Sequence, residues 1–406
     1  MKTVVGVLYT LLPEIILLVV ATLLTHYAAY FPDAGTLATE LVALFILLVA
    51  LALSMQFNRS RMFFALLTLL IGCGALLLLA TTRDNLSRQL LTGSLCIFLP
   101  LNLVCMHALE ERGIFTRYGA WPFGLLLLEI VFVMALMATH AQGVANALFV
   151  EFFKWPALST IAISQPGLLL LVIGLLWLND RLIRRHSAEL AAFFFSLVTV
   201  AVMLHSKQPV TVAVFAAAAA LAFGVAVILE SWNMAYLDEL TGLPGRRALE
   251  EQMRQLGNRY VIAMLDVDHF KNFNDTYGHD MGDQVLRLVA SRLQARAGGG
   301  KAFRYGGEEF SVLYPGKNLK EVAPALDLLR AEIETSGFNP RRGERRSGLE
   351  TPDAVDNEIS LRVTVSIGAA ENDGTRKDPW DVLKTADQAL YDAKNTGRNR
   401  VCLERV

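Results

Sequence analysis

Long apolar runs, separated by short polar segments, dominate the first 229 residues of the chain. Each run is close to the ~20 residues that a helix needs to cross a hydrocarbon core. Eight such runs cover residues 4–25, 36–55, 62–81, 89–108, 119–139, 157–179, 187–205 and 209–229. The first run has no small-residue cleavage site and more runs follow it, so we interpret it as a retained span. The pattern predicts an all-α transmembrane bundle of about eight helices.

The pattern changes after the eighth run. Residues 230–237 contain no Gly or Pro, so we expect them to continue the last span as a helical linker. Such a linker either passes a movement of the bundle to the following domain or serves as a plain tether.

Short apolar strands alternate with amphipathic helices between residues 238 and 406. Strands are expected at YVIAMLDVD, KAFRY, EFSVLYP, LRVTVSIGAA and RVCLE, and helices at 281–296, 318–335 and 379–395. Residues 337–358 are polar and read as a loop. This order predicts an α/β domain of ferredoxin-like type, with a βααββαβ core.

Composition agrees with this division into a membrane domain (1–229), a linker and a soluble domain (238–406). Residues 1–230 hold only 12 of the 37 Lys and Arg residues and 11 of the 38 Asp and Glu residues. The mean hydropathy of the chain is +0.42, which is high for a soluble protein. The net charge is −1 and neither half of the chain is strongly basic, so we expect no nucleic-acid partner. The four cysteines have no spacing typical of a zinc site or a disulfide framework.

The loops between the spans indicate an orientation. Arginines gather in alternate loops, at Arg59 and Arg61, at 112 and 117, and at 181, 184 and 185. The positive-inside rule then places both termini in the cytoplasm, with membrane lipid around the bundle.

Three acids lie within the apolar runs, namely Glu14, Glu40 and Glu129. Burying a carboxylate at membrane depth is costly, so each of these acids can be expected to face a cavity, a ligand or a partner helix. The alternative is that each lies near the end of a span or is protonated.

Carboxylates at two places in the soluble half are candidates for chemistry. Asp266 and Asp268 flank Val267 at the C-terminal end of the first strand, and Glu308 and Glu309 follow Gly306 and Gly307 at the hairpin between the second and third strands. If this hairpin lies beside the first strand, the carboxylates of Asp266 and Glu308 converge, which suits Mg²⁺ held together with substrate phosphates. The alternative is a solvated turn. The two glycines favour a site, because a base or a phosphate can approach a backbone without side chains closely.

Basic and amide residues offer complementary contacts. Lys394 and Arg398 are four apart near a predicted helix end, so they either hold a triphosphate together or form a solvated pair. Asp283 can accept from the ring N–H and the exocyclic amine of guanine, and the amide of Asn274 can bond its other polar atoms.

Several blocks of sequence, taken in order, resemble the GGDEF family of diguanylate cyclases in its GGEEF form. They are RYGGEEF at 304–310, DELTGLPGRR at 238–247, DVDHFKNFNDTYGHDMGD at 266–283, TVSIGAA at 364–370 and ADQALYDAKNTGRNR at 386–400. The resemblance implies a membrane-bound enzyme that condenses two GTP into cyclic di-GMP, acts as a homodimer, and lies in the bacterial inner membrane with its C-terminal domain in the cytoplasm.

The resemblance also implies roles for individual residues. Asp266, Glu308 and the backbone carbonyl of Val267 would bind Mg²⁺, or Mn²⁺ in its place, and Glu309 would support a second ion. Glu308 would be the general base for the 3′-hydroxyl. The substrate contacts would come from Asn274, Asp283 and His279 at guanine, from Lys271, Lys394 and Arg398 at the phosphates, and from Gly306 and Gly307 against the nucleotide.

The chain departs from the family pattern before the signature. Many members carry an Arg-x-x-Asp pair there that binds product and inhibits the enzyme, but Ala297 and Gly300 stand at these positions. We therefore expect no product-inhibition site. Other classes remain open at this point: an inactive domain that binds GTP or cyclic di-GMP as a receptor, a transporter or receptor formed by the spans, or a cyclase with another nucleotide product.

Overall fold

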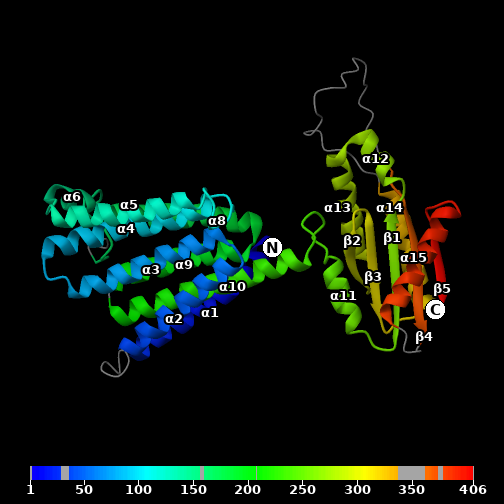
Figure 1. The fold of residues 1–406 in the computed structure, drawn as a ribbon, viewed down its shortest axis with the longest axis horizontal. Helices are drawn as coiled ribbons and strands as arrows, with labels where there is room; N and C mark the ends of the chain where they lie inside the picture. The colour runs from blue at the N-terminus through cyan, green and yellow to red at the C-terminus, as the bar shows by residue number, and fades with distance from the viewer. Residues whose placement is uncertain are drawn as a thin grey trace, which may run out of the picture. The chain divides into compact units, whose positions relative to one another are not determined.

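The computed structural model describes residues 2–28, 36–155, 160–206, 208–336, 362–373 and 378–405. The chain divides into two compact units, Met1–Ser231 and Trp232–Val406 (Figure 1). The first is helical, whereas the second is built on a β-sheet.

Within the described residues, eight helices that lie in or begin in the first unit are long and apolar enough to cross a membrane, which confirms the predicted number. They are α1 (Lys2–Ala28), α2 (Thr36–Gln56), α3 (Ser60–Thr81), α4 (Asn85–Ala108), α5 (Ala120–Ala138), α8 (Gln165–Arg185), α9 (Ala188–Ser206) and α10 (Pro209–Tyr236). A short helix, α6 (Gln142–Leu148), lies between α5 and α8.

The sixth span begins at Gln165, not near residue 157 as the apolar run predicted. Ser164 is the N-cap and accepts a hydrogen bond from the backbone N–H of Gly167. Pro166 lies in the first turn, where a backbone N–H has no partner within the helix, so its missing N–H costs no hydrogen bond. A Cβ added at Gly167 would lie 2.6 Å from both Cβ and O of Cys96, so the start of α8 packs closely on α4. Capping chemistry and close packing therefore decide this boundary.

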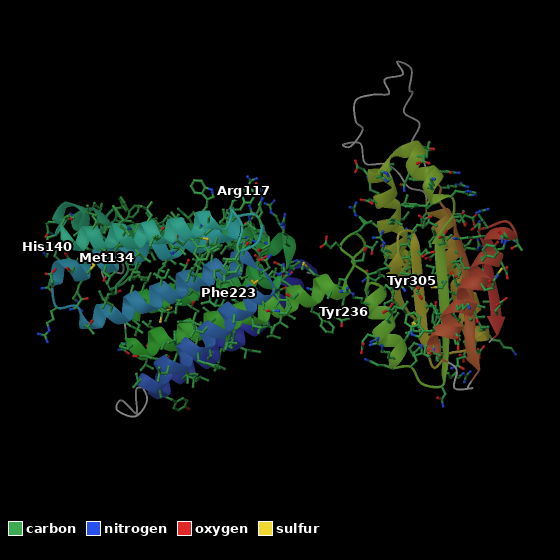
Figure 2. All side chains as sticks on the ribbon, in the orientation of Figure 1. Arg117, Met134, His140, Phe223, Tyr236 and Tyr305 are labelled. Carbon is green, nitrogen blue, oxygen red and sulfur yellow. The ribbon has the colours of Figure 1, made fainter. Side chains whose placement is uncertain are left out.

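Burial is uneven across the bundle. In α4 and α10, 72% of the residues in the most apolar segment are buried inside the protein, against 11% in α1 and α5. Phe223 of α10 is fully buried inside the bundle, where its ring meets the ring of Phe193 edge to face at 5.0 Å (Figure 2). The outward side chains of α1 and α5 are mostly large and apolar, as a hydrocarbon environment requires.

Two of the three acids within the apolar runs have distinctive surroundings. Glu129 on α5 accepts a hydrogen bond of 2.6 Å from the side-chain amide of Asn102 on α4, so it does meet a partner helix. Glu14 on α1 is 6% exposed. Glu40 on α2 is half-buried.

The second unit contains a mixed sheet of five strands, as predicted. The strands are β1 (Arg259–Val267), β2 (Lys301–Gly306), β3 (Glu309–Pro315), β4 (Val365–Asp373) and β5 (Val401–Arg405). Their order is β2-β3-β1-β4-β5, antiparallel except for the β4–β5 pair. The central strand β1 is buried on both faces, which explains its continuous apolar sequence.

Helices cover both faces of this sheet, because the side chains of β1 alternate between them. Val261, Ala263 and Leu265 pack against α13 (His279–Arg296) and α14 (Leu319–Thr335). Ile262 and Met264 pack on the other face against α11 (Arg246–Arg254) and α15 (Pro379–Asn395). The remaining helix, α12 (Phe270–Tyr277), directly follows the end of β1. The predicted loop at 337–358 lies outside the described residues.

The helix α10 runs without a break to Tyr236, where the rings of Trp232 and Tyr236 stack at 4.1 Å. The chain then forms a tight turn, in which Leu237 pairs with Pro244 and Gly245 pairs with Arg304 of β2. This turn attaches the start of the second unit to the strand that leads into the Gly-Gly-Glu-Glu hairpin.

Candidate active site

The carboxylates of Asp266 and Glu309 lie on the same face of the sheet, at the end where β1 and β3 meet. Asp266 and Glu309 are direct cross-strand partners, so their side chains project side by side. Asp266 is only 6% exposed. Glu308 lies in the hairpin loop, and its carbonyl accepts a 3.4 Å hydrogen bond from the backbone N–H of Val267. This bond holds the hairpin against the end of β1, so Asp266 becomes a neighbour of Glu308 and Glu309, which lie about 40 residues later in the sequence.

These three acids affect one another electrostatically. Burial raises the pKa of each carboxyl group, and the charge of Asp266 raises the pKa of Glu308 and Glu309 further. Lys394 opposes this effect, because its Nζ lies 2.8 Å from Oδ2 of Asp266. The cluster therefore holds more negative charge than Lys394 neutralises, and it favours an added cation.

The donor set of this cluster fits Mg²⁺. Among the described residues, no group of three or more His, Cys, Asp or Glu side chains is arranged to hold a metal ion. Mg²⁺ does not require such a group, since one or two carboxylates commonly bind it together with substrate phosphates and waters. The carboxylates of Asp266 and Glu308 provide hard oxygens of this kind, and Glu309 lies beside them.

A fourth acid nearby, Asp268, has a different role. Its Oδ1 accepts from the hydroxyl of Ser366 at 2.6 Å, and its Oδ2 accepts from the hydroxyl of Thr364 at 2.7 Å and from the backbone N–H of Asn399 at 3.1 Å. Both oxygens are thus engaged within the protein. Asp268 organises the surrounding backbone, whereas Asp266 remains available for a ligand.

The hairpin loop consists of Gly307 and Glu308, one residue later than the Gly-Gly pair suggested. The β2–β3 register shifts between Arg304 and Gly306, so Gly306 still pairs with Glu309 as the last residue of β2. Gly307 has a φ of +49°, which favours glycine in a two-residue hairpin. A Cβ added at either glycine would meet no described atom within 4 Å, so the space in front of this backbone is open to a nucleotide.

Arg304 clamps this loop, a role that sequence reasoning missed. Its Nη1 donates to the two carboxylate oxygens of Asp238 at 2.7 and 2.9 Å, while its Nε and Nη2 donate to the carbonyl of Gly307 at 3.1 and 2.7 Å. Burial alone would raise the pKa of Asp238, but hydrogen bonds from Thr241 and Arg304 outweigh it and lower that pKa. One guanidinium thus joins the turn at 238 to the hairpin loop that carries Glu308. The arginine inside the block RYGGEEF was the available signal.

The residues expected at guanine come from α12 and α13. Asn274 on α12 is half-buried, and its Oδ1 is buried without a hydrogen-bond partner among the described residues. Asp283 on α13 is also half-buried, whereas His279 at the start of α13 is exposed. The two helices meet at Gly278, whose φ of +87° permits the sharp reversal. An unpaired buried amide oxygen is costly, so this oxygen is a good candidate to bind a ligand.

Gly282 is a second residue that the sequence did not single out. A Cβ at this position would lie 1.9 Å from Oδ1 of Asn274 and 3.1 Å from the ring of Phe270. Only glycine leaves the amide of Asn274 where it is. The glycine next to Asp283 in the block DVDHFKNFNDTYGHDMGD was the available signal.

Lys394 and Arg398 do not lie on one helix, although they are four apart near the predicted helix end. Lys394 lies in the last turn of α15, but the helix ends at Asn395, and Arg398 lies in the following turn with a φ of +60°. Both nevertheless act on Asp266, because each of the two positive charges lowers its pKa. Lys271, in the first turn of α12, is exposed.

Packing at the expected product-inhibition positions leaves little room for a larger side chain. Ala297 is 7% exposed, and a Cβ added at Gly300 would lie 2.5 Å from a ring atom of Tyr314 and 2.6 Å from Val312.

Comparisons with known proteins concern the second unit. A family model described as "Diguanylate cyclase, GGDEF domain" matches residues 235–400. Diguanylate cyclase VdcA of Vibrio cholerae is 38% identical over 172 residues, which are 41% of this chain and 46% of VdcA. Response regulator PleD of Caulobacter vibrioides is 35% identical over 182 residues, which are 42% of this chain and 36% of PleD. This chain thus spans less than half the length of either relative.

Among solved structures, the coiled coil and GGDEF domain of DgcB from Caulobacter crescentus, in complex with c-di-GMP, is 34% identical. The match covers 44% of this chain and 90% of that chain, with a TM-score of 0.39.

Proposed function

Because residues 235–400 form a GGDEF domain whose homologues include diguanylate cyclases, we propose that this protein condenses two GTP molecules into cyclic di-GMP and two pyrophosphates. The observation that carries the proposal is the group of carboxylates formed by Asp266, Glu308 and Glu309 beside Lys394. It has the charge and the hard oxygens needed to hold a divalent cation and a nucleotide triphosphate together.

The reaction consists of two identical transfers. The 3′-oxygen of one GTP attacks the α-phosphorus of the other, the bond to the β-phosphate oxygen breaks, and pyrophosphate leaves. The carboxylate of Glu308 accepts the proton of the attacking hydroxyl, and burial raises its pKa, which makes it a stronger base than a solvated carboxylate. When bound, Mg²⁺ supplies positive charge to the phosphate oxygens.

The remaining residues position the substrate. Asn274 and Asp283 bind guanine, with His279 nearby, and Gly306 and Gly307 leave room for the nucleotide against the hairpin. The phosphates are held by the basic residues Lys271, Lys394 and Arg398. Binding and orientation of this kind account for much of the rate gain when two substrates must meet in line.

The active unit is a two-fold homodimer. Each domain binds one GTP, and a two-fold axis lets the two sites face each other so that both transfers follow by symmetry.

The membrane unit anchors this chemistry and regulates it. The alternation of arginines between loops supports a C-terminal domain in the cytoplasm, where GTP is available, and the bacterial relatives support an inner-membrane location for the bundle. A signal received by the bundle changes how often two catalytic domains meet.

Product analysis tests the proposed function. Full-length protein in detergent is incubated with GTP and Mg²⁺, and the products are identified by mass spectrometry. We expect cyclic di-GMP from the wild type and from Glu251→Ala, which removes a surface carboxylate on α11 that pairs with Arg254 at 3.4 Å. Glu308→Ala should yield none, while remaining folded. Product from Glu308→Ala would contradict the role of Glu308, and no product from the wild type would favour a receptor that binds nucleotide without catalysis.

A further inference from the structure

The turn after α15 has an unusual backbone. Gly397, Arg398 and Asn399 have φ values of +120°, +60° and +47°. Residues other than glycine rarely adopt positive φ, because Cβ crowds the backbone, and such a conformation persists only where the surroundings hold it. This turn carries Arg398, so whatever holds the turn also determines where the guanidinium of Arg398 can reach.

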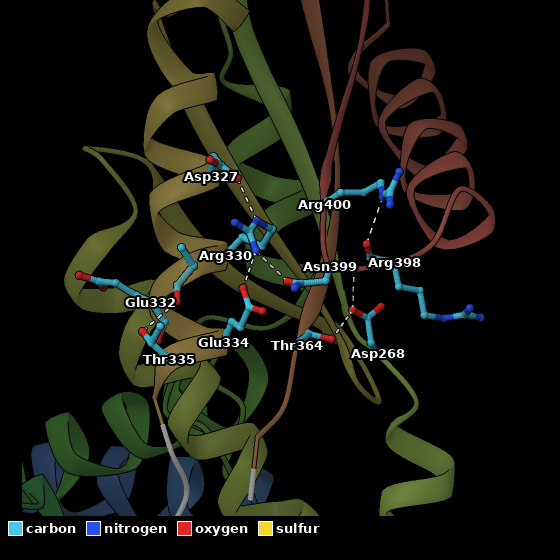
Figure 3. Close-up of polar contacts among 11 residues, drawn as sticks. Asp268, Asp327, Arg330, Glu332, Glu334, Thr335, Thr364, Arg398, Asn399 and Arg400 are labelled. Atoms are coloured by element: carbon cyan, nitrogen blue, oxygen red, sulfur yellow. Dashed lines mark hydrogen bonds and ion pairs between the residues drawn. The ribbon is translucent and has the colours of Figure 1, made fainter.

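Two contacts of Asn399 hold the turn (Figure 3). Its backbone N–H donates to Oδ2 of Asp268 at 3.1 Å, and its side-chain Oδ1 accepts from Nη1 of Arg330 at 2.9 Å. The first contact anchors the turn to the end of β1, two residues beyond Asp266. The second anchors it to α14, an element outside every sequence block of the family.

Arg330 is itself fixed in place. Its side chain is 16% exposed, its Nε donates to Asp327 at 2.9 Å, and its Nη1 donates to Glu334 at 2.9 Å. Glu334 also bonds the side chain of Asn399, which together with Arg330 lowers the pKa of this glutamate. Two carboxylates of its own helix restrict the movement of the Arg330 guanidinium, so it can hold the side chain of Asn399 in one position.

The side chain of Arg398 takes no part in this network. It extends away from Arg330 and Asn399 in the close-up, whereas its carbonyl accepts from Nε of Arg400 at 3.1 Å (Figure 3). The network therefore fixes the backbone of Arg398, whose guanidinium makes no hydrogen bond or ion pair with the described part of the chain and can meet a ligand.

We propose that Arg330 and Asn399 are positioning residues for the triphosphate: they hold the 397–399 turn in its left-handed conformation, so that Arg398 is presented to the phosphates of GTP. The inference rests on the proposed function for the identity of the ligand. It predicts a selective loss, because the guanine contacts come from α12 and α13 and do not depend on this turn.

Binding measurements on the full-length protein in detergent test this proposal. The two probes are a non-hydrolysable α,β-methylene analogue of GTP and guanosine, which has no phosphates. We expect Arg330→Met to weaken binding of the GTP analogue by about fivefold, the ratio for the loss of one well-placed hydrogen bond. Binding of guanosine should not change.

Two further variants separate positioning from folding. Asn399→Gly keeps a residue that tolerates positive φ and keeps the backbone N–H, but it removes the contact with Arg330, so it should reproduce the loss. Arg296→Met removes an arginine on α13 that pairs with Glu332 of α14 at 3.2 Å, and it should bind both probes like the wild type.

A double-mutant cycle with Arg398→Met decides whether Arg330 acts through Arg398. In the Arg398→Met background, adding Arg330→Met should cause no further loss of GTP-analogue binding. Additive losses, an equal weakening of guanosine binding, or full binding of the analogue by both Arg330→Met and Asn399→Gly would each overturn the proposal. The cycle needs no turnover, so its outcome is separate from the product analysis that tests the proposed function.

Discussion

Replacing Gly282 by alanine probes the guanine site without touching any group that would contact the base. The new Cβ would lie 1.9 Å from Oδ1 of Asn274, far inside contact distance, and 2.9 Å from its Cγ. The end of the Asn274 side chain can rotate away, because it makes no hydrogen bond through Oδ1 among the described residues. We therefore expect the protein to fold with the amide of Asn274 displaced from its site.

The magnitudes favour an effect on binding over one on stability. Alanine at position 282, in the first turn of α13, gains up to about 1 kcal/mol over glycine from helix propensity. This gain offsets much of the ~1–3 kcal/mol that overpacking costs. A displaced amide at Asn274 loses up to two hydrogen bonds to guanine, worth about 2 kcal/mol together. That loss corresponds to a roughly 30-fold weaker Kd for GTP.

The assay is the binding of a non-hydrolysable GTP analogue to full-length protein in detergent, compared among Gly282→Ala, Asn274→Ala and the wild type. Gly257→Ala is the matched control, because a Cβ at Gly257 meets no atom within 4 Å. Gly282→Ala should lose as much affinity as Asn274→Ala, and the double variant should lose no more. Wild-type affinity of Gly282→Ala beside a weakened Asn274→Ala would refute the reasoning.

Three other predictions concern packing, pH and product. Gly368→Ala should destabilise the second unit by about 3 kcal/mol or more, because its Cβ would meet backbone atoms of α15 at 2.0 to 2.6 Å. Faster hydrogen exchange of the β1 and β4 amides in the full-length protein would show this destabilisation, and unchanged protection would contradict the prediction. Asp238→Asn should cost about 1–3 kcal/mol at pH 7. Because the pKa of Asp238 is lowered in the folded protein, its carboxylate contributes fully to stability above pH 3.8, the ordinary pKa of Asp. This contribution is lost as the pH falls through the pKa of Asp238 in the folded state. The difference in hydrogen exchange between Asp238→Asn and the wild type should therefore shrink below pH 3.8. Cyclic di-GMP titrated against the initial rate should show no strong non-competitive inhibition, since Ala297 and Gly300 provide no charged pair.

Local pattern was enough to predict most of the elements. Helical spans, the buried strand β1 and the helices α13, α14 and α15 follow from hydrophobic periodicity, which each segment carries within its own sequence, whereas the short helices α11 and α12 were given no range. The errors lie at boundaries. Pro166 and the Ser164 cap moved the start of α8, and a register shift moved the hairpin loop by one residue.

Contacts between distant segments could not be predicted in this way. The pairing of Asp266 with Glu309, the close approach of Gly282 to Asn274 and the hold of Arg330 on Asn399 join residues that no local pattern connects. The sequence by itself determined which segments are apolar helices, which are strands and which residue types are available for chemistry. The tertiary structure alone decided which of those residues meet, because cross-strand register and helix packing act over ångström distances that a one-dimensional pattern does not contain.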